Sequence, residues 1–304
     1  MISNNNLKNY IIVIKNIIER IVEFKAEVVA DSPLLISEGG KDHVKEVMKN
    51  VDGVPIIPGS SWKGVFRSVG EIVAKENDIN VCSGLTNDKD NCLKKEVKNT
   101  EKCKQKKPQT RLTVNDCLND YLKSGDIESA VKLVFERTCL NCKIFGAQSI
   151  IAQTIFMDSL AKNYKLGTRP MIAIDRKTGS VSKNALVTLE YVEPGSTFDF
   201  TLYTYNLPNY ALGYLLEIME RINNHMFQIG GNKSRGFGFI SFKNVTMTLK
   251  TEKLEKGTWK ALDNLDKDVI LDHQVAEKGE EFFKKVKPLK EVFKNVKIKF
   301  PEKY

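Results

Sequence analysis

Alternating apolar and polar residues predict several short strands along the chain. Residues 21–30 alternate Ile, Val and Phe with charged residues, and residues 198–205 alternate in the same way, as half-buried strands do. Further strands are predicted at residues 154–160, 170–174, 185–192 and 239–249. Residues 193–196 are Glu-Pro-Gly-Ser, which predicts a turn that joins 185–192 and 198–205 in a hairpin.

Two other segments have the spacing of helices with one buried stripe. The first follows residues 56–59, and Ser60 and Ser61 are its candidate N-caps. Its apolar stripe consists of Trp62, Val65, Phe66, Val69, Ile72 and Val73. The stripe of the second helix consists of Leu212, Leu215, Leu216, Met219, Ile222 and Met226. The order strand, helix, strands, helix, strand is typical of an α+β fold of the ferredoxin-like, or RNA-recognition-motif-like, type, with two helices on one face of a sheet.

Residues 78–126 differ from this core, because apolar residues become sparse and lysine is dense between residues 89 and 107. This composition indicates an insertion on the core. The last ~50 residues are charged and only weakly periodic, and their pattern predicts no particular structure.

The composition narrows the class of protein. The chain has 304 residues, of which 41% are hydrophobic and 28% charged, the balance of a folded protein. No apolar run approaches the ~20 residues that span a bilayer, so we expect a cytoplasmic protein with no membrane partner. The net charge of +9 makes an anionic partner the first candidate.

All six cysteines lie between residues 82 and 142. Cys139 and Cys142 have the spacing of half a tetrahedral zinc site, and a reducing compartment disfavours disulfides. We expect the other two ligands to be Cys82 and Cys92, with Cys103 and Cys117 as alternatives. A structural zinc ion would order an insertion that has little apolar surface of its own. Free reduced thiols are the remaining alternative.

The glycine-rich segment 230–238 is the strongest candidate for ligand binding. Four glycines let its backbone approach a ligand, and Lys233, Ser234 and Arg235 lie between them. Backbone amides and two cations suit phosphate oxygens. The segment lacks the order of a P-loop, and a predicted strand follows it where a dinucleotide fingerprint needs a helix. The alternative is a tight turn with incidental charge.

Histidines give little support to a hydrolase. His43, His225 and His273 are scattered, and the sequence contains neither Gly-x-Ser-x-Gly nor His-Glu-x-x-His. His225 lies at the end of the second apolar stripe, where a helix C-terminal residue is expected. Phe145, Phe237 and Phe239 lie near basic residues and could stack on bases, but core packing explains them better.

Four segments together resemble the RAMP superfamily of CRISPR-associated proteins, and within it the repeated backbone subunit of type III effector complexes. The segments are Ile57–Gly64 with Arg67, Cys139–Gly146, Ile174–Gly179 with Ala185, Leu186 and Glu190, and Gly230–Gly238. Each is short, but the four follow one another in the family's order and extend over about two thirds of the chain.

The resemblance implies a single RAMP domain over residues 1–304. Its parts would be an RNA-recognition-motif-like palm, a zinc-binding lid at 78–145, a thumb hairpin at 162–184 and a C-terminal extension at 250–304. Such subunits self-associate along a guide RNA, together with other effector subunits, and the guide pairs with a target RNA; sequence is then read by base pairing. The residues expected along the RNA are Lys63, Arg67, Arg176, Lys177, Lys233, Ser234 and Arg235.

The resemblance also implies target-RNA cleavage supported by an aspartate in the loop before Ile57, where Asp42 is the candidate. A Mg²⁺ or Mn²⁺ ion there would activate the ribose 2′-hydroxyl. One alternative is a metal-independent endoribonuclease that processes CRISPR repeat RNA, with His43 as a candidate base. Another is a non-catalytic scaffold that binds single-stranded RNA.

Overall fold

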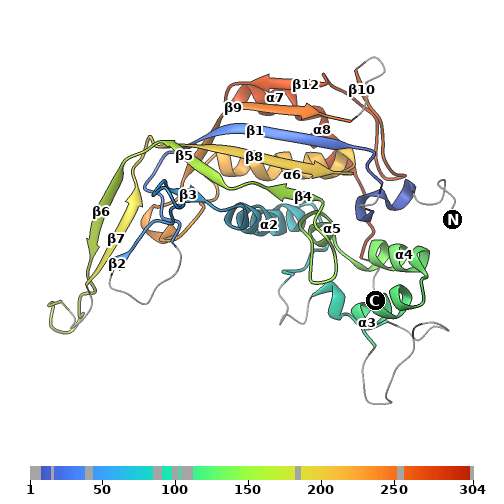
Figure 1. The fold of residues 1–304 in the computed structure, drawn as a ribbon, viewed down its shortest axis with the longest axis horizontal. Helices are drawn as coiled ribbons and strands as arrows, with labels where there is room; N and C mark the ends of the chain where they lie inside the picture. Colours follow the sequence, from blue (N-terminus) through green and yellow to red (C-terminus); the bar gives the residue numbers. More distant parts are fainter. Residues whose placement is uncertain are drawn as a thin grey trace.

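A seven-stranded sheet lies at the centre of the computed structural model (Figure 1). The structure describes residues 8–14, 17–37, 44–84, 91–97, 103, 112–181, 186–251 and 257–301. The strands of the sheet are β1 (Ile21–Ala30), β3 (Ile56–Ile57), β4 (Thr154–Phe156), β5 (Ser159–Asn163), β8 (Thr197–Tyr205), β9 (Ile240–Leu249) and β12 (Gln274–Glu277). Their order is β12-β9-β1-β8-β5-β3, and β4 also pairs with β8. The long predicted strands β1, β8 and β9 are thus neighbours at the centre, and the mixed α+β class is confirmed.

The alternation of buried and exposed residues along β1 shows which face of the sheet packs against the core. Val22, Phe24 and Val28 are buried, whereas Lys25 between them is exposed. The antiparallel pairing with β8 places Phe24 opposite Leu202, so the buried positions of neighbouring strands lie on the same face. A one-residue slip would expose all of them.

Two helices cover this face of the sheet (Figure 1). In α2 (Gly59–Glu76) the predicted apolar stripe is turned inward except for Ile72, which is exposed. Trp62 packs against Phe200 with ring centroids 4.9 Å apart. Met226 of the second predicted stripe lies beyond the end of α6 (Asn209–Asn223) and is exposed, but the helix itself is buried on almost every side. This exceeds the predicted single stripe because α8 (Lys287–Asn295) packs on its outer surface. At Gly213 a Cβ would lie 2.1 Å from the backbone oxygen of Leu289.

The first turns of both helices are capped by distant aspartates. The N-cap position of α2 is Pro58, which has no side-chain donor or acceptor, and the Gly59 amide donates to Oδ1 of Asp158 at 2.8 Å. The prediction that Ser60 or Ser61 caps the helix is therefore wrong, because both lie inside its first turn. In the same way Asp266 accepts from the amide of Asn209, the first residue of α6.

A hairpin projects from the end of the main sheet (Figure 1). Its strands are β6 (Leu166–Met171) and β7 (Val187–Val192), and β7 also pairs in parallel with β2 (Val44–Lys45). The predicted β7–β8 hairpin is wrong. A turn does form at residues 193–196, but it connects two different sheets, because β7 pairs with β6 whereas β8 pairs with β1. The projecting hairpin begins four residues after the start of the predicted thumb and extends to Val192.

The segment predicted to form the lid consists of helices and loops beside α2 (Figure 1). Its described elements are η2 (Cys92–Lys94), α3 (Val114–Lys123), α4 (Ile127–Arg137) and α5 (Leu140–Phe145). A capping box between Thr113 and Asp116 starts α3, and Asp126 caps α4. Cys103 and Cys117 form a disulfide bond, although the sequence analysis took disulfides to be disfavoured and kept these two cysteines as alternative metal ligands.

The C-terminal extension is integrated into the core. Its elements besides β12 and α8 are β10 (Thr258–Trp259), β11 (Val269–Ile270) and α7 (Glu280–Lys285). Two short helices lie elsewhere in the chain, η1 (Lys8–Val13) and η3 (Lys233–Arg235). The strand β12 extends one edge of the main sheet, and Leu289 and Phe293 of α8 are buried against α6. Among the helices of the described residues, none is long and apolar enough to cross a membrane.

Candidate functional site

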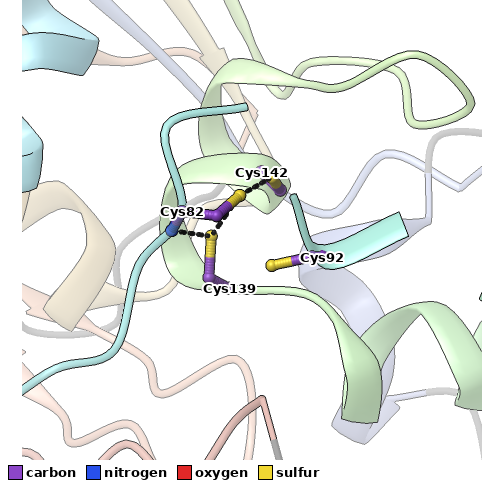
Figure 2. A group of neighbouring side chains, drawn as sticks. All are labelled: Cys82, Cys92, Cys139 and Cys142. Atoms are coloured by element: carbon purple, nitrogen blue, oxygen red, sulfur yellow. Dashed lines mark hydrogen bonds between the residues drawn. The ribbon is translucent and has the colours of Figure 1, made fainter. Parts of the chain in front are cut away.

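Four cysteines from three separate segments of the lid meet in one cluster (Figure 2). Cys82 follows α2, Cys92 begins η2, and Cys139 and Cys142 lie at the start of α5. Their sulfur atoms all lie within 4.8 Å of one another, and all four side chains are buried. The structure thus brings together the four cysteines that the sequence analysis selected as ligands.

The spacing of the sulfur atoms resembles that of a tetrahedral metal centre. Cys82 Sγ lies 3.3 Å from Cys142 Sγ and 3.8 Å from Cys139 Sγ. A tetrahedron with Zn–S bonds of ~2.3 Å has sulfur atoms ~3.8 Å apart. Contact with the neighbouring thiols, together with burial, raises the pKa of Cys142 far above its usual range. A cation among the four sulfurs would oppose this effect and favour the thiolates.

Arg67 of α2 contacts this cluster and joins it to the core. Its Nη2 donates to Cys142 Sγ at 3.4 Å, while Nε and Nη1 donate to the backbone oxygens of Ser83 at 3.1 Å and Gly146 at 2.8 Å. All three nitrogens of the guanidinium are therefore engaged within the protein. Arg67 was predicted to lie along RNA, and the geometry gives it a different set of partners. Nearby Lys63 is half-buried, and burial lowers the pKa of its ammonium.

Lys143, the residue after Cys142, has a buried amine without a hydrogen-bond partner among the described residues. Its side chain is fully buried, and no described atom forms a hydrogen bond with Nζ. The ammonium lies over the rings of Phe135 and Phe300. Burial lowers the pKa of Lys143, and negative charge on the cysteines acts in the opposite direction. Ionised sulfur atoms next to it would offset the cost of an unpaired buried ammonium.

The disulfide separates Cys103 and Cys117, the alternative candidates for metal ligands, from Cys82 and Cys92. Cys103 and Cys117 are bonded to each other and buried with Leu112 in a separate cluster. They are therefore not part of the four-cysteine group in Figure 2.

The glycines of segment 230–238 hold its backbone tightly against residues 33–35, which follow β1. Gly230 has φ +84°, and a Cβ there would lie 2.4 Å from the backbone oxygen of Leu35. At Gly238, with φ +91°, a Cβ would lie 2.1 Å from the backbone oxygen of Ile229. Hydrogen bonds from Gly231 to Leu35 and from Gly238 to Pro33 complete the attachment. A larger residue at Gly230 would displace the loop from Leu35, and one at Gly238 would displace the two ends of the loop from each other.

The tip of this loop presents its cations outward. Lys233, Ser234 and Arg235 form the one-turn helix η3, and all three are exposed. Left-handed residues bracket the turn, Asn232 with φ 55° and Gly236 with φ 81°. Arg235 donates to Oδ1 of Asn232 at 3.1 Å, whereas the Lys233 ammonium has no partner among the described residues. The loop is therefore rigid at its base and free to bind an anion at its tip.

The predicted cations of the hairpin lie at its exposed tip. Arg176 and Lys177 are both exposed, and the side chain of Asp175 accepts the amide hydrogens of Lys177 at 2.7 Å and Thr178 at 3.3 Å. An Asx-type turn thus shapes the tip. These cations and the glycine loop both lie on segments that extend from the sheet (Figure 1).

The catalytic candidates Asp42 and His43 lie outside the described residues. The chain that follows them is attached to the base of the hairpin. Val44 pairs with Thr188 of β7, and Glu190 accepts from the Val47 amide at 3.0 Å and from the Lys49 ammonium at 2.9 Å. His225 lies at the C-terminal end of α6, as predicted, and contacts Asp31 at 2.8 Å.

The sequence analysis missed Arg169 and Tyr191, which lie on the hairpin and contact Phe237 of the glycine loop. The guanidinium of Arg169 on β6 lies over the rings of Tyr191 on β7 and Phe237 of the loop. Phe237 and Phe145 are buried in the core, as expected. The two-residue spacing of Gly167 and Arg169 places them on one face of a strand, but nothing in that short pattern identifies the partner rings.

The fold and these segments define the class of protein. Residues 27–241 match the RAMP superfamily, and this range includes β3, β4, β5 and β8 of the sheet, the hairpin and the glycine loop. The chain belongs to the RAMP superfamily. Over 127 residues it is 30% identical to the CRISPR system Cmr endoribonuclease Cmr4 of Pyrococcus furiosus. That stretch is 40% of this chain and 42% of the relative.

Proposed function

We propose that this protein is an RNA-binding backbone subunit of a type III CRISPR effector complex and binds along the guide RNA. The observation that carries the proposal is the tip of the glycine loop, where Lys233, Ser234 and Arg235 are exposed on a backbone held tightly to the residues that follow β1. The family and the resemblance to Cmr4 support the same class of ligand. The guide RNA, the target RNA and neighbouring effector subunits are the proposed partners.

The chemistry of the loop favours contacts with the RNA backbone. Cations and unpaired polar groups bind phosphate and ribose without reading a sequence, and base pairing between guide and target then supplies specificity. The net charge of +9 agrees with a polyanionic ligand.

Charge reversal in the loop tests this proposal. Lys233→Glu with Arg235→Glu should weaken the binding of single-stranded RNA and reduce the slope of log affinity against log salt concentration. Lys297→Glu with Lys299→Glu is the matched control, because these two lysines are also exposed, also two residues apart and distant in sequence from the loop. Equal affinity of the two double variants would refute the role of the loop.

A second candidate function is cleavage of the target RNA, with Asp42 as the residue that supports dependence on Mg²⁺ or Mn²⁺. The similarity to a relative named as an endoribonuclease favours it. Guide-paired target RNA should be cut only with a divalent cation, and Asp42→Ala should abolish the cuts. Metal-independent cutting of repeat RNA at one place, lost in His43→Ala, would favour the processing alternative.

We also propose that the four-cysteine cluster binds a structural zinc ion. The sulfur spacing, the Arg67 donor and the unpaired Lys143 ammonium support it, because four thiolates and Zn²⁺ carry a net charge of −2. Elemental analysis of the purified protein should find one zinc per chain. Cys139→Ser with Cys142→Ser should lose it, whereas Cys103→Ser with Cys117→Ser should retain it. Equal zinc content in the two variants would refute this ligand set.

A further inference from the structure

The hairpin and the glycine loop meet at a small aromatic platform that carries an arginine. Gly167 of β6 lies opposite Tyr191 of β7 in the antiparallel register. A Cβ on Gly167 would lie 2.7 Å from the ring of Tyr191, so the ring lies directly across the glycine. Arg169 lies two residues further along β6 and therefore on the same face of the hairpin.

The Arg169 guanidinium lies over two rings at once. Its Cζ is 5.4 Å from the ring centroid of Tyr191 and 5.2 Å from that of Phe237. The two rings form an edge-to-face pair with centroids 5.6 Å apart. The two distances from Cζ to a ring centroid lie within the ~6 Å range of cation–π attraction. Since Phe237 is fully buried, the platform that orients the guanidinium is part of the core.

The N–H groups of Arg169 have no protein partner among the described residues. The side chain is exposed, and no carboxylate or carbonyl of those residues accepts a hydrogen bond from it. Leu189, which lies opposite Arg169 in the hairpin, has no side-chain acceptor. Glu190 lies opposite Thr168, on the other face, and binds Val47 and Lys49. A planar guanidinium that is oriented on its face and unpaired at its rim is suited to bidentate binding of a phosphate.

The platform also lies beside the cations of the glycine loop. Phe237 is two residues from Arg235 and directly follows Gly236. The contact between Arg169 and Phe237 therefore places the base of the hairpin against the loop whose tip presents Lys233 and Arg235. A polyanion that follows the loop would pass the rim of Arg169.

We propose that Arg169 binds a phosphodiester of single-stranded RNA where the hairpin meets the glycine loop, and that Tyr191 and Phe237 orient its guanidinium. This inference rests on the proposed function, because it assigns a further contact to the same RNA. It adds a contact on the hairpin base to those already proposed on the loop.

Binding of a fluorescein-labelled single-stranded RNA, measured by anisotropy at several salt concentrations, tests the proposal. Arg169→Ala should weaken binding about tenfold and lower the salt slope by about 0.7, the value for one phosphate contact on a single strand. Arg169→Lys should keep the salt slope but lose affinity, because an ammonium lacks the planar fork. Tyr191→Phe keeps the ring and should bind like the wild type, whereas Tyr191→Leu should weaken binding.

The matched control is Lys243→Ala, which removes one exposed positive charge from β9 of the main sheet. Equal affinities of Arg169→Ala and Lys243→Ala would overturn the assignment of Arg169 while leaving RNA binding intact. Wild-type protein that does not bind RNA would overturn the proposed function itself. Since Arg169 is exposed, equal melting temperatures of variant and wild type are expected, and they ensure that a loss of affinity is not a loss of fold.

Discussion

Asp263 offers a test of the buried polar network that supports α6. Its Oδ2 accepts from the hydroxyl of Tyr210 at 3.0 Å, and Oδ1 accepts from the amides of Leu265 at 2.9 Å and Asp266 at 3.0 Å. Burial raises the pKa of this carboxyl from 3.8 to about 6, although the two amides and the hydroxyl act in the opposite direction. The ionised form is therefore less favourable in the folded protein than in the unfolded chain.

The size of the effect on stability follows from the linkage between proton binding and folding. A pKa difference of about 2 corresponds to about 3 kcal/mol at 1.36 kcal/mol per unit. Because the folded-state pKa is the higher one, the folded protein binds more protons between pH 4 and 6. This group therefore lowers the free energy of unfolding as the pH rises through that window. Its full cost is present above pH 6, and none remains below pH 4.

Asp263→Asn removes the charge and keeps the shape. Its carboxamide oxygen can accept from the same two amides, and its NH₂ group can donate to the Tyr210 hydroxyl. We expect the free energy of unfolding at pH 7 to rise by up to about 3 kcal/mol, and the melting temperature by on the order of 5 °C. The gain should shrink from pH 6 to pH 4.

Thermal unfolding of variant and wild type across this pH range measures the difference. Titrating groups that do not interact with Asp263 contribute equally to both proteins and cancel, whereas the charge of Asp266, which also raises the pKa of Asp263, is part of the measured difference. Asp272→Asn is the control, because that carboxylate is exposed, and its difference from wild type should be small and constant. A destabilised Asp263→Asn protein, or a gain that does not depend on pH, would refute the account of this network.

Two further predictions concern contacts that join separate segments. Asp158→Ala removes the cap of α2 and should lower the free energy of unfolding by about 1 kcal/mol, measured by denaturant unfolding; a change no larger than that of Asp272→Ala would contradict the capping role. Arg67→Ala removes the donor to Cys142 and should weaken zinc binding by about 10- to 100-fold, measured by competition with a chromogenic chelator. Unchanged zinc affinity in a folded Arg67→Ala protein would show that this contact has no effect on the cluster.

The sequence predicted those parts of the fold that depend on local periodicity. The alternation in β1, β8 and β9 and the apolar stripe of α2 are strong because one face of each element is buried in the core. The helix caps could not be predicted in this way. Asp158 is 99 residues from the amide that it caps, and Asp266 is 57 residues from its own.

The wrong hairpin prediction came from competition between alternative strand pairings. The turn at 193–196 is favourable for a hairpin, but β7 pairs with β6 and β8 pairs with β1, whose register places Phe24 opposite Leu202 in the core. For the site, the spacing of Cys139 and Cys142 was sufficient to predict a cluster. Arg67 and Arg169 were harder, because a cation on an amphipathic element can turn toward sulfur, aromatic rings or solvent, and only the tertiary structure decides among them.

The most direct test of the central claim is the nucleic acid that the protein carries. We expect protein purified from its native host to contain RNA of discrete length with CRISPR spacer sequence. Protein with Lys233→Glu and Arg235→Glu should contain much less of it, while the Lys297→Glu, Lys299→Glu control should contain as much as the wild type. Purified wild-type protein without RNA, or with RNA of random length and sequence, would contradict the assignment as a guide-binding backbone subunit.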